Sequence, residues 1–404
     1  MPSLFLTNFF FPKPMANGVC IYQVAKTACK EDGISYVLCY RREGEKEHEI
    51  IDGIDVRRIN LPKYHQWMFA DETKTMGKVV KYAGLLVGRL KKAIHMFDYP
   101  LRDGAVVRRF VKEACELIDA EKVDRIVCSY TPAEAVKAGQ IIKSIRTNIK
   151  YIYYSLDTLS NESGAGFLPE KYRRSLGLQR EQKYFDFADK IILMNCHKEH
   201  YDSSIYDKFK SKISFADFPL FVPKEQKVYK DTPHDKIIIY AGSLYRVIRN
   251  PKFMLDVLCP VLDKYYLDFY GYSDCDDIIA EYTKKTNGHV RIHGLVEYDV
   301  VQEQLNKADV LISIGNKGTD MAPSKIYEYI STGKPIIHFY SSNEDPCLRV
   351  LFNYPMKLII REGEKVDIAR LIKFLNCGET VDTYSFISHY VESTPEYTLK
   401  LIKE

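Results

Sequence analysis

Short apolar runs alternate with longer amphipathic stretches along almost the whole chain. Because a helix fits between each pair of consecutive runs, the pattern predicts parallel sheets joined by right-handed crossover connections. The runs that we interpret as strands form two sets, residues 3–10, 35–40, 55–60, 125–130, 151–157 and 190–195, and then residues 236–242, 267–272, 290–296, 309–315, 335–340 and 357–362.

Two sets of strands predict two domains, and 404 residues with 46% hydrophobic content can fill both cores. The join at 219–235 is rich in proline and charge and has no hydrophobic period, as expected of a linker. The fold class is therefore α/β, with two Rossmann-like, doubly wound parallel-sheet domains that face a cleft. The expected domains are 1–218 and 236–380, and the helical segment 381–404 could cross back to the first of them.

The chain has no features of an exported or membrane-spanning protein. Its ten cysteines contain no C-x-x-C pair, which favours a reducing compartment. The first residues lack a basic region and a cleavage site, and no run of about 18 apolar residues occurs. We therefore expect a cytoplasmic protein.

The net charge of +4 is unevenly placed, because residues 74–112 contain ten Lys and Arg against the two acids Asp98 and Asp103. Apolar residues lie between these cations near helical spacing, which predicts a basic amphipathic helix. Two interpretations have equal weight. The helix either makes peripheral contact with an anionic membrane, at the inner face, or packs on its own domain with a solvated basic face.

A candidate phosphate site follows the first strand of the second domain. Gly242 and Ser243 end the strand, Arg246 and Arg249 lie on the loop, and a helix begins near Asn250-Pro251. Guanidinium groups beside a helix N-terminus favour a bound diphosphate. The alternative is a surface loop with two solvated arginines.

A second candidate site surrounds a short helix near residue 325. Asp320 precedes the helix, Pro323 takes its first position, and Ser324 and Lys325 lie in its first turn. Glu328 is expected to point away from the buried face, where its two oxygens could hold a ribose diol. The alternative is an ion pair between Glu328 and Lys325 on a solvated face.

A third, weaker candidate is the loop at residues 11–19. Gly18 would let a ligand approach the backbone at the N-terminus of the helix that begins near Val19. Alternatively, Asn17-Gly18 is only a turn.

Several of these features together resemble the C-terminal half of a GT-B glycosyltransferase of the retaining family 4 type. The resemblance covers most of residues 236–362, and the first half is similar in outline. It implies that the second domain holds a nucleotide-sugar, and that no cofactor and no metal is needed. The motifs that support it are Gly242-Ser243-Leu244 with cations beyond, Gly271 at a strand end, RIHGLV, NKADVLIS, and D-x₇-E running into EYISTGKPII.

The resemblance also assigns roles to individual residues. Glu328 matches the second acid of the family motif, which holds the ribose, and Asp320 matches the first, which faces the donor sugar. Arg249 stands one position from the phosphate-binding lysine of the family, and Gly18 near a glycine that lets the donor pass. Arg246 and Arg249 would stabilise the charge of the leaving diphosphate.

This sequence departs from the family pattern at three places. Asp320 is one carbon shorter than the usual glutamate, and Pro323 removes one N–H group from a possible phosphate site. A His-Asp pair of the first domain is reduced to Asp157, which with Asn161 is a candidate for acceptor binding. Asp274-Cys275-Asp276 resembles a metal-binding D-x-D motif, but acids at this position are expected to cap a helix.

The expected function is transfer of a sugar from a nucleotide-sugar, such as a UDP- or GDP-sugar, to a glycan or lipid-linked acceptor with retention. Surface polysaccharide biosynthesis is the expected setting. A nucleotide-sugar epimerase of similar build, or a non-catalytic sugar-nucleotide or glycan-binding relative, is the alternative.

Overall fold

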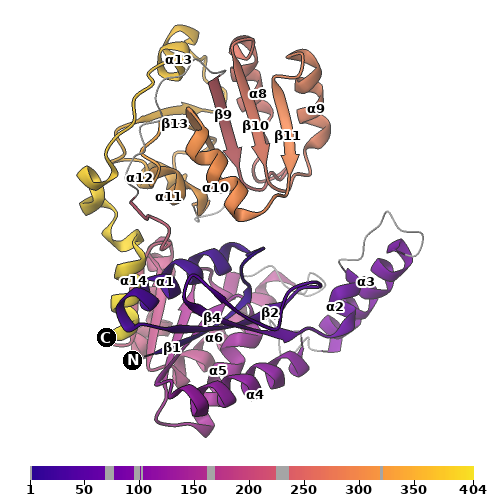
Figure 1. The fold of residues 1–404 in the computed structure, drawn as a ribbon, viewed down its shortest axis with the longest axis vertical. Helices are drawn as coiled ribbons and strands as arrows, with labels where there is room; N and C mark the ends of the chain where they lie inside the picture. The colour runs from indigo at the N-terminus through magenta and orange to yellow at the C-terminus, as the bar shows by residue number, and fades with distance from the viewer. Residues whose placement is uncertain are drawn as a thin grey trace. The chain divides into compact units, whose positions relative to one another are not determined.

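The chain folds into two compact units, Met1–Pro219 together with Pro395–Glu404, and Leu220–Thr394. Each unit has its own largely parallel sheet and its own buried apolar core (Figure 1). The predicted α/β class is therefore confirmed. The final segment is divided, since residues 381–394 belong to the second unit and 395–404 to the first. This computed structural model describes residues 2–68, 77–94, 101, 103–161, 169–223, 236–318 and 322–404.

The first unit contains an eight-stranded sheet in the order β3-β4-β2-β1-β5-β6-β7-β8. Every neighbouring pair is parallel except β3 and β4, which form an antiparallel pair. The strand order reverses between β1 and β5, which is where ligands of doubly wound sheets bind. The strands are β1 (Ser3–Phe9), β2 (Ser35–Arg41), β3 (His48–Ile51), β4 (Ile54–Asn60), β5 (Arg125–Tyr130), β6 (Lys150–Ser155), β7 (Lys190–Met194) and β8 (Ile213–Ala216).

The last helix of the chain, α14, lies against α1 of this unit. The Nζ of Lys403 lies 2.8 Å from Glu31 and 2.9 Å from Asp32, at the C-terminal end of α1. The α-helices of the unit are α1 (Ala16–Asp32), α2 (Lys63–Met68), α3 (Gly77–Ile94), α4 (Gly104–Glu121), α5 (Ala133–Ile145), α6 (Glu170–Phe187), α7 (Lys198–Tyr201) and α14 (Pro395–Lys403).

The second unit contains a six-stranded parallel sheet in the order β11-β10-β9-β12-β13-β14. This is the Rossmann order 3-2-1-4-5-6, and its reversal point lies between β9 and β12. The elements are β9 (Lys236–Ala241), α8 (Lys252–Leu258), β10 (Tyr265–Tyr270), α9 (Asp276–Lys285), β11 (Val290–Gly294), α10 (Tyr298–Lys307), β12 (Val310–Ile314), α11 (Lys325–Ile330), β13 (Ile336–Tyr340), α12 (Pro346–Val350), β14 (Lys357–Arg361) and α13 (Ile368–Leu375).

The prediction of one basic amphipathic helix at 74–112 is wrong, because the structure has two helices there, α3 and α4. The carboxylate of Asp103 accepts the N–H of Ala105 at 2.9 Å and so starts α4 as a separate helix. None of the described helices is both long and apolar enough to cross a membrane.

Candidate functional site

The loop after β9 is fixed at the reversal point of the second sheet. Its backbone continues the pairing with β10, since Gly242 N–H donates to Tyr270 O and Leu244 N–H to Tyr272 O, both at 2.8 Å. Gly271 makes this approach possible, because a Cβ on it would lie 2.2 Å from the Gly242 carbonyl oxygen. The loop is therefore held in place by backbone contacts.

Arg249 extends from this loop over the end of β9. Its guanidinium hydrogen-bonds the phenol of Tyr240, and its Nε is buried without a hydrogen-bond partner in the described part of the chain. Tyr240 in turn donates to the Ser243 carbonyl at 3.1 Å. Burial raises the pKa of Tyr240, and the charge of Arg249 opposes that rise. Arg249 is thus a cation with unused donor capacity at the reversal point.

Arg246, which the sequence places beside it, engages a different element. Its guanidinium lies 2.6 Å from the Asp277 carboxylate at the start of α9, and its backbone N–H donates to Asp274 at 2.7 Å. The ion pair with Arg246 lowers the pKa of Asp277. Asp274, the first acid of the D-x-D sequence, therefore braces the loop, and the two arginines are not equivalent.

The helix after this loop begins close to the predicted position. The side chain of Asn250 accepts the N–H of Lys252 at 2.9 Å, where α8 starts. A pocket lies beside this turn, at the carboxyl ends of β12 and β13. It is lined by Ile248, Asn250, Phe253, Met254, Ile314, Gly315, Lys317, Phe339, Tyr340, Ser341 and Glu362.

Glu328 is buried, with 8% of its surface exposed, whereas the helical period predicted a position facing a cleft or water. Its Oε2 accepts from Lys325 at 2.9 Å, from Gln302 at 2.5 Å and from Tyr298 at 3.3 Å. The prediction failed because α10 covers the side of α11 that helical periodicity left polar. All three contacts use Oε2, and no hydrogen bond to Oε1 occurs among the described residues, so Oε1 is available to a ligand hydroxyl.

The short helix α11 begins at Lys325, after Ser324 as its N-cap, so Pro323 does not occupy the first helical position. Gly333 lies in the turn after α11 with φ +67°, a left-handed conformation that glycine adopts without steric cost. Asp320, the predicted first acid of the motif, lies outside the described residues.

Tyr329 connects the two candidate groups. Its hydroxyl accepts from the Ala241 N–H at 2.7 Å and lies 3.1 Å from the Ala241 carbonyl, which ties α11 to the end of β9. Burial raises its pKa strongly, Glu328 adds to this rise, and Arg249 opposes it. The charges of Glu328 and Arg249 thus both act on the Tyr329 hydroxyl, although the two residues are 79 positions apart in the sequence.

No pattern in the sequence indicated a buried cluster at the end of β13. The Nε2 of His338 lies 3.3 Å from Asp345 Oδ2, and Cys347 is next to them, with ligand atoms within 4.8 Å of one another. These residue types can bind a metal. However, Asp345 already accepts the Cys347 N–H at 2.8 Å as the cap of α12, and its carboxylate fills the space left by Gly315. The cluster therefore has a structural role.

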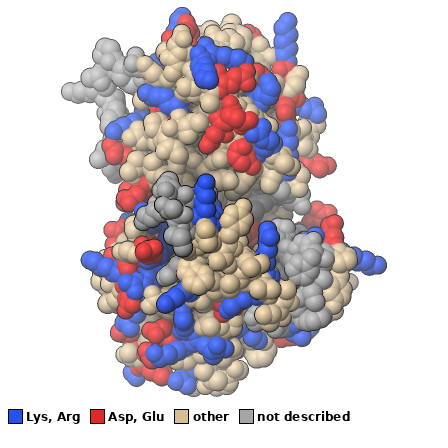
Figure 2. Space-filling model, turned by 90° about the vertical axis from the view of Figure 1, so that its right-hand side faces the viewer, with Lys and Arg blue, Asp and Glu red and all other residues tan. Residues whose placement is uncertain are grey.

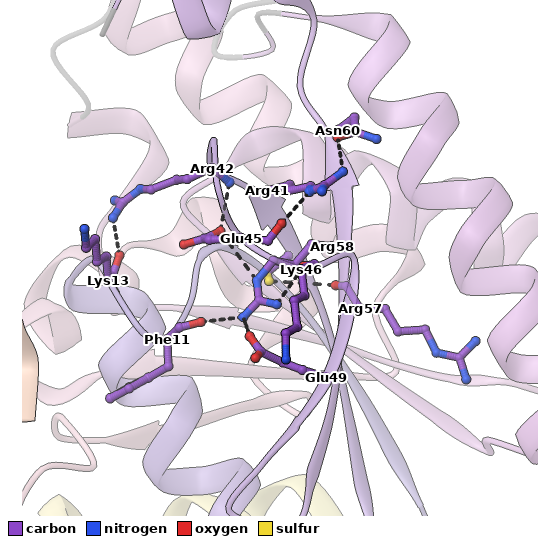
Figure 3. Close-up of polar contacts among 11 residues, drawn as sticks. Phe11, Lys13, Arg41, Arg42, Glu45, Lys46, Glu49, Arg57, Arg58 and Asn60 are labelled. Carbon is purple, nitrogen blue, oxygen red and sulfur yellow. Dashed lines mark hydrogen bonds and ion pairs between the residues drawn. The ribbon is translucent and has the colours of Figure 1, made fainter. Parts of the chain in front are cut away.

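At the reversal point of the first unit, the loop after β1 is held by cations. Arg58 is fully buried and donates to the Phe11 carbonyl at 2.6 Å (Figure 3). The same guanidinium lies 2.5 Å from Glu49 and 3.5 Å from Glu45. Arg42 donates to the carbonyl of Lys13. These two arginines are therefore already hydrogen-bonded or ion-paired to carbonyl and carboxylate groups of their own unit.

Gly18 lies in the first turn of α1, where a Cβ would lie 2.2 Å from the Phe9 carbonyl oxygen. Close packing of α1 on the end of β1 thus requires glycine independently of any ligand. The neighbouring Asn17 is part of this helix and donates to the Thr131 carbonyl at 2.8 Å, which connects α1 to the segment that follows β5.

Asp157 follows β6 of the same sheet. Burial raises the pKa of Asp157, and no cation among the described residues opposes this rise. Such a carboxyl group holds a proton more readily than an exposed one. Asn161 ends the short 3₁₀ helix Leu159–Asn161. The buried Glu181 accepts the Leu159 N–H at 3.2 Å and so fixes the start of this turn.

Comparisons with solved structures identify the fold across nearly the whole chain. HepE of Anabaena, solved with UDP and glucose, is 14% identical with a TM-score of 0.54, over 99% of this chain and 95% of that one. The UDP-forming α,α-trehalose-phosphate synthase of Burkholderia xenovorans, solved with glucose-6-phosphate, is 11% identical with a TM-score of 0.57, and each chain is fully covered. No protein-family model and no curated protein sequence matches.

A third similar structure is a putative UDP-N-acetylglucosamine 2-epimerase of Listeria monocytogenes. It is 12% identical with a TM-score of 0.51, over 99% of this chain and 95% of that one. The chain therefore has the GT-B fold, which glycosyltransferases and an epimerase share. The resemblance that we drew from the sequence is confirmed at the level of this fold.

Proposed function

We propose that this protein is a glycosyltransferase whose second unit binds a nucleotide-sugar donor at the reversal point between β9 and β12. The proposal rests on one observation: an arginine with an unpaired buried Nε and a carboxylate with an uncommitted oxygen lie around Tyr329 at that point. Arg249 would bind the diphosphate, and Oε1 of Glu328 would accept from the ribose diol.

The proposed reaction needs only groups that these ligands and the chain supply. A bond forms between the acceptor oxygen and the anomeric carbon, while the bond from that carbon to the diphosphate oxygen breaks. The acceptor proton passes to the leaving diphosphate on the same face of the sugar, so configuration is retained. Arg249 stabilises the negative charge that develops on the diphosphate, and no metal takes part. Asp320 would contact the donor sugar.

The acceptor is proposed to be a glycan or a lipid-linked sugar that binds to the first unit. Asp157 is the group assigned to it there, because its raised pKa suits a hydrogen bond to a sugar hydroxyl. Gly242, Ser243, Ser324 and Lys325 complete the proposed donor site. A cytoplasmic role in making surface polysaccharide follows from this acceptor class.

A panel of UDP-, GDP-, ADP- and dTDP-sugars tests the donor assignment by thermal shift, since a ligand at about 100 times its Kd stabilises the native state by about 2.7 kcal/mol. One sugar nucleotide is expected to raise the melting temperature of the wild type. That donor is then incubated with pooled glycan and polyprenyl-linked acceptors, and free nucleoside diphosphate is measured.

Acceptor-dependent release of nucleoside diphosphate supports transfer. An isomerised donor without acceptor would instead establish an epimerase, the activity named for the similar Listeria structure. Binding without turnover would establish a non-catalytic sugar-nucleotide or glycan-binding protein. A panel in which no nucleotide-sugar changes the melting temperature would contradict the donor site itself.

A further inference from the structure

Helix α3 of the first unit turns its apolar side to solvent. Five large apolar residues on it have relative exposures of 57–76%. At 100° per residue they lie on one side of the helix, on a stripe centred near Leu86 and Leu90. An amphipathic helix of a globular domain normally buries such a stripe. The five residues, which we call the α3 stripe, are Val79, Tyr82, Leu86, Leu90 and Ile94.

The opposite side of α3 attaches it to the domain. Gly77 and Gly84 are buried on that side. Helix α3 packs against α2, and both helices extend away from the sheet (Figure 1). The Nζ of Lys91 lies 2.7 Å from the Asp103 carboxylate, and Tyr64 of α2 donates to the same carboxylate at 2.8 Å. The small residues and this partly buried ion pair thus fix the helix so that the stripe faces outward.

The charges on α3 are all positive. Residues 77–94 contain five Lys and Arg and no acid. Lys78 and Arg89 are exposed and lie on one flank of the stripe, about 80 to 100° from its centre. Figure 2 views the first unit from the side of α3 and shows uncharged surface bordered by Lys and Arg. An apolar stripe flanked by cations matches the headgroup region of an anionic bilayer.

We propose that α3 lies in the surface of an anionic membrane, with the α3 stripe among the lipid chains and Lys78 and Arg89 at the headgroups. A length of about 27 Å for 18 residues and five charges suits a helix parallel to the surface. A second copy of this chain is a poorer occupant, because a two-fold contact would set these cations against themselves. The proposal does not depend on the donor site.

The test is co-sedimentation of the full-length protein with vesicles of phosphatidylcholine alone and of phosphatidylcholine mixed with phosphatidylserine. Wild type is expected to bind only the mixed vesicles. Binding should weaken as salt is raised above 0.1 M, where the Debye length is about 10 Å. Absence of binding at low salt, or equal binding to both kinds of vesicle, would overturn the proposal.

Two variants separate the charges from the stripe. Lys78→Gln with Arg89→Gln is expected to weaken binding roughly 30-fold, from about 1 kcal/mol for each cation near the surface. Lys112→Gln with Lys208→Gln removes two exposed lysines of the same unit outside α3 and is expected to change nothing. An equal loss in both pairs would show general charge attraction and would refute a role for α3.

Leu86→Gln with Leu90→Gln removes the centre of the stripe and is expected to abolish sedimentation with vesicles. The matched control, Ile50→Gln with Ile145→Gln, changes residues of 60% and 52% exposure elsewhere in the unit and should bind like wild type. Melting curves and nucleotide-sugar binding should be unchanged in both. A wild-type dimer that Leu86→Gln with Leu90→Gln dissociates, without vesicle binding, would instead assign the stripe to a second copy.

Discussion

The loops after β1 and β9 occupy the same topological position in the two sheets and use their cations differently. In the first unit, the guanidinium of Arg58 is enclosed by Glu45, Glu49 and the Phe11 carbonyl (Figure 3). In the second unit, the guanidinium of Arg249 hydrogen-bonds the neutral phenol of Tyr240 and pairs with no carboxylate of the described residues. The Nε of each arginine is buried without a hydrogen bond in the described part of the chain, so the counter-charge is what differs. Arg249 lies on the loop after β9, at the reversal point where α/β proteins bind ligands, whereas Arg58 comes from β4 and contacts the loop after β1.

This difference shows that topology alone does not identify a ligand site. A cation whose charge is matched inside the domain stabilises a loop, because any ligand would have to displace its partners. A cation that is desolvated without a counter-charge gains the most from a bound anion. We therefore propose a structural role for Arg58 and a ligand role for Arg249, and each proposal makes predictions.

The largest effect is expected from Arg58→Met. The change leaves Glu45 and Glu49 without their shared cation and removes the hydrogen bond to Phe11. We expect the free energy of unfolding to fall by about 4 kcal/mol, which urea denaturation would measure. Arg57→Met is the control, because Arg57 lies next to Arg58 on β4 but is 32% exposed. Similar losses in both variants would remove the distinction between a buried and a surface arginine.

Lys334 of the second unit extends the comparison to a buried cation without an acid beside it. Its Nζ donates to the carbonyls of Asn306, at 2.6 Å, and Ala308. Burial lowers the pKa of Lys334 from 10.5 to about 8, and the charge of Asp309 offsets only part of this. Between these pH values the unfolded chain binds a proton that the folded chain does not.

Stability from this group should therefore rise with pH between about 8 and 10.5. The unfolding free energy of wild type, minus that of Lys334→Met, should therefore increase by about 3 kcal/mol over that window. Lys307→Met removes a lysine in an exposed pair with Glu303 and should show no such growth. A flat difference for Lys334→Met would mean that its ammonium stays charged in the fold.

Arg249→Gln is expected to weaken nucleoside diphosphate binding by about 2 kcal/mol, the size of a hydrogen bond to a charged group, and to leave the bare nucleoside almost unaffected. Isothermal titration with both ligands would measure the two losses. Arg246→Gln is the matched control on the same loop, because Arg246 is already paired with Asp277. If Arg246→Gln had the larger effect, the assignment of the two arginines would be reversed.

The smallest of these effects is expected from Glu328→Gln, which keeps the size of the side chain and weakens its hydrogen bonds. Donor binding should fall by about 1.5 kcal/mol, for the nucleoside and the diphosphate alike, because the ribose is common to both. Glu303→Gln makes the same chemical change on the exposed side of α10. Unchanged affinity in Glu328→Gln would limit Glu328 to holding α10 and α11 together.

The strands of both sheets could be predicted from the sequence because their signal is local. Every apolar run that we interpreted as a strand forms one, and Asn250 caps α8 as its position indicates. The two strands that the pattern missed, β3 and β8, are short edge strands with little buried apolar surface. Gly333 follows α11 with a positive φ of +67°, a local conformation that glycine adopts more readily than other residues.

The candidate site could be predicted only in part from the sequence. The sequence placed Arg246 and Arg249 on one loop, but it could not tell which of them Asp277 of α9 would neutralise. It identified Glu328, but periodicity within α11 could not show that α10 would cover it. The need for glycine at position 18 comes from the Phe9 carbonyl, which the packing of α1 on β1 brings close.

Local sequence patterns were thus enough to predict the elements and their alternation, since backbone propensity and hydrophobic period act over a few neighbouring residues. Which side chains have partners depends on how the elements pack. This packing buries the apolar stripe of α4 in the core while it leaves that of α3 exposed, although both helices are amphipathic. Charge pairing and burial depend on which elements the strand order places next to each other, and no local pattern encodes that contact.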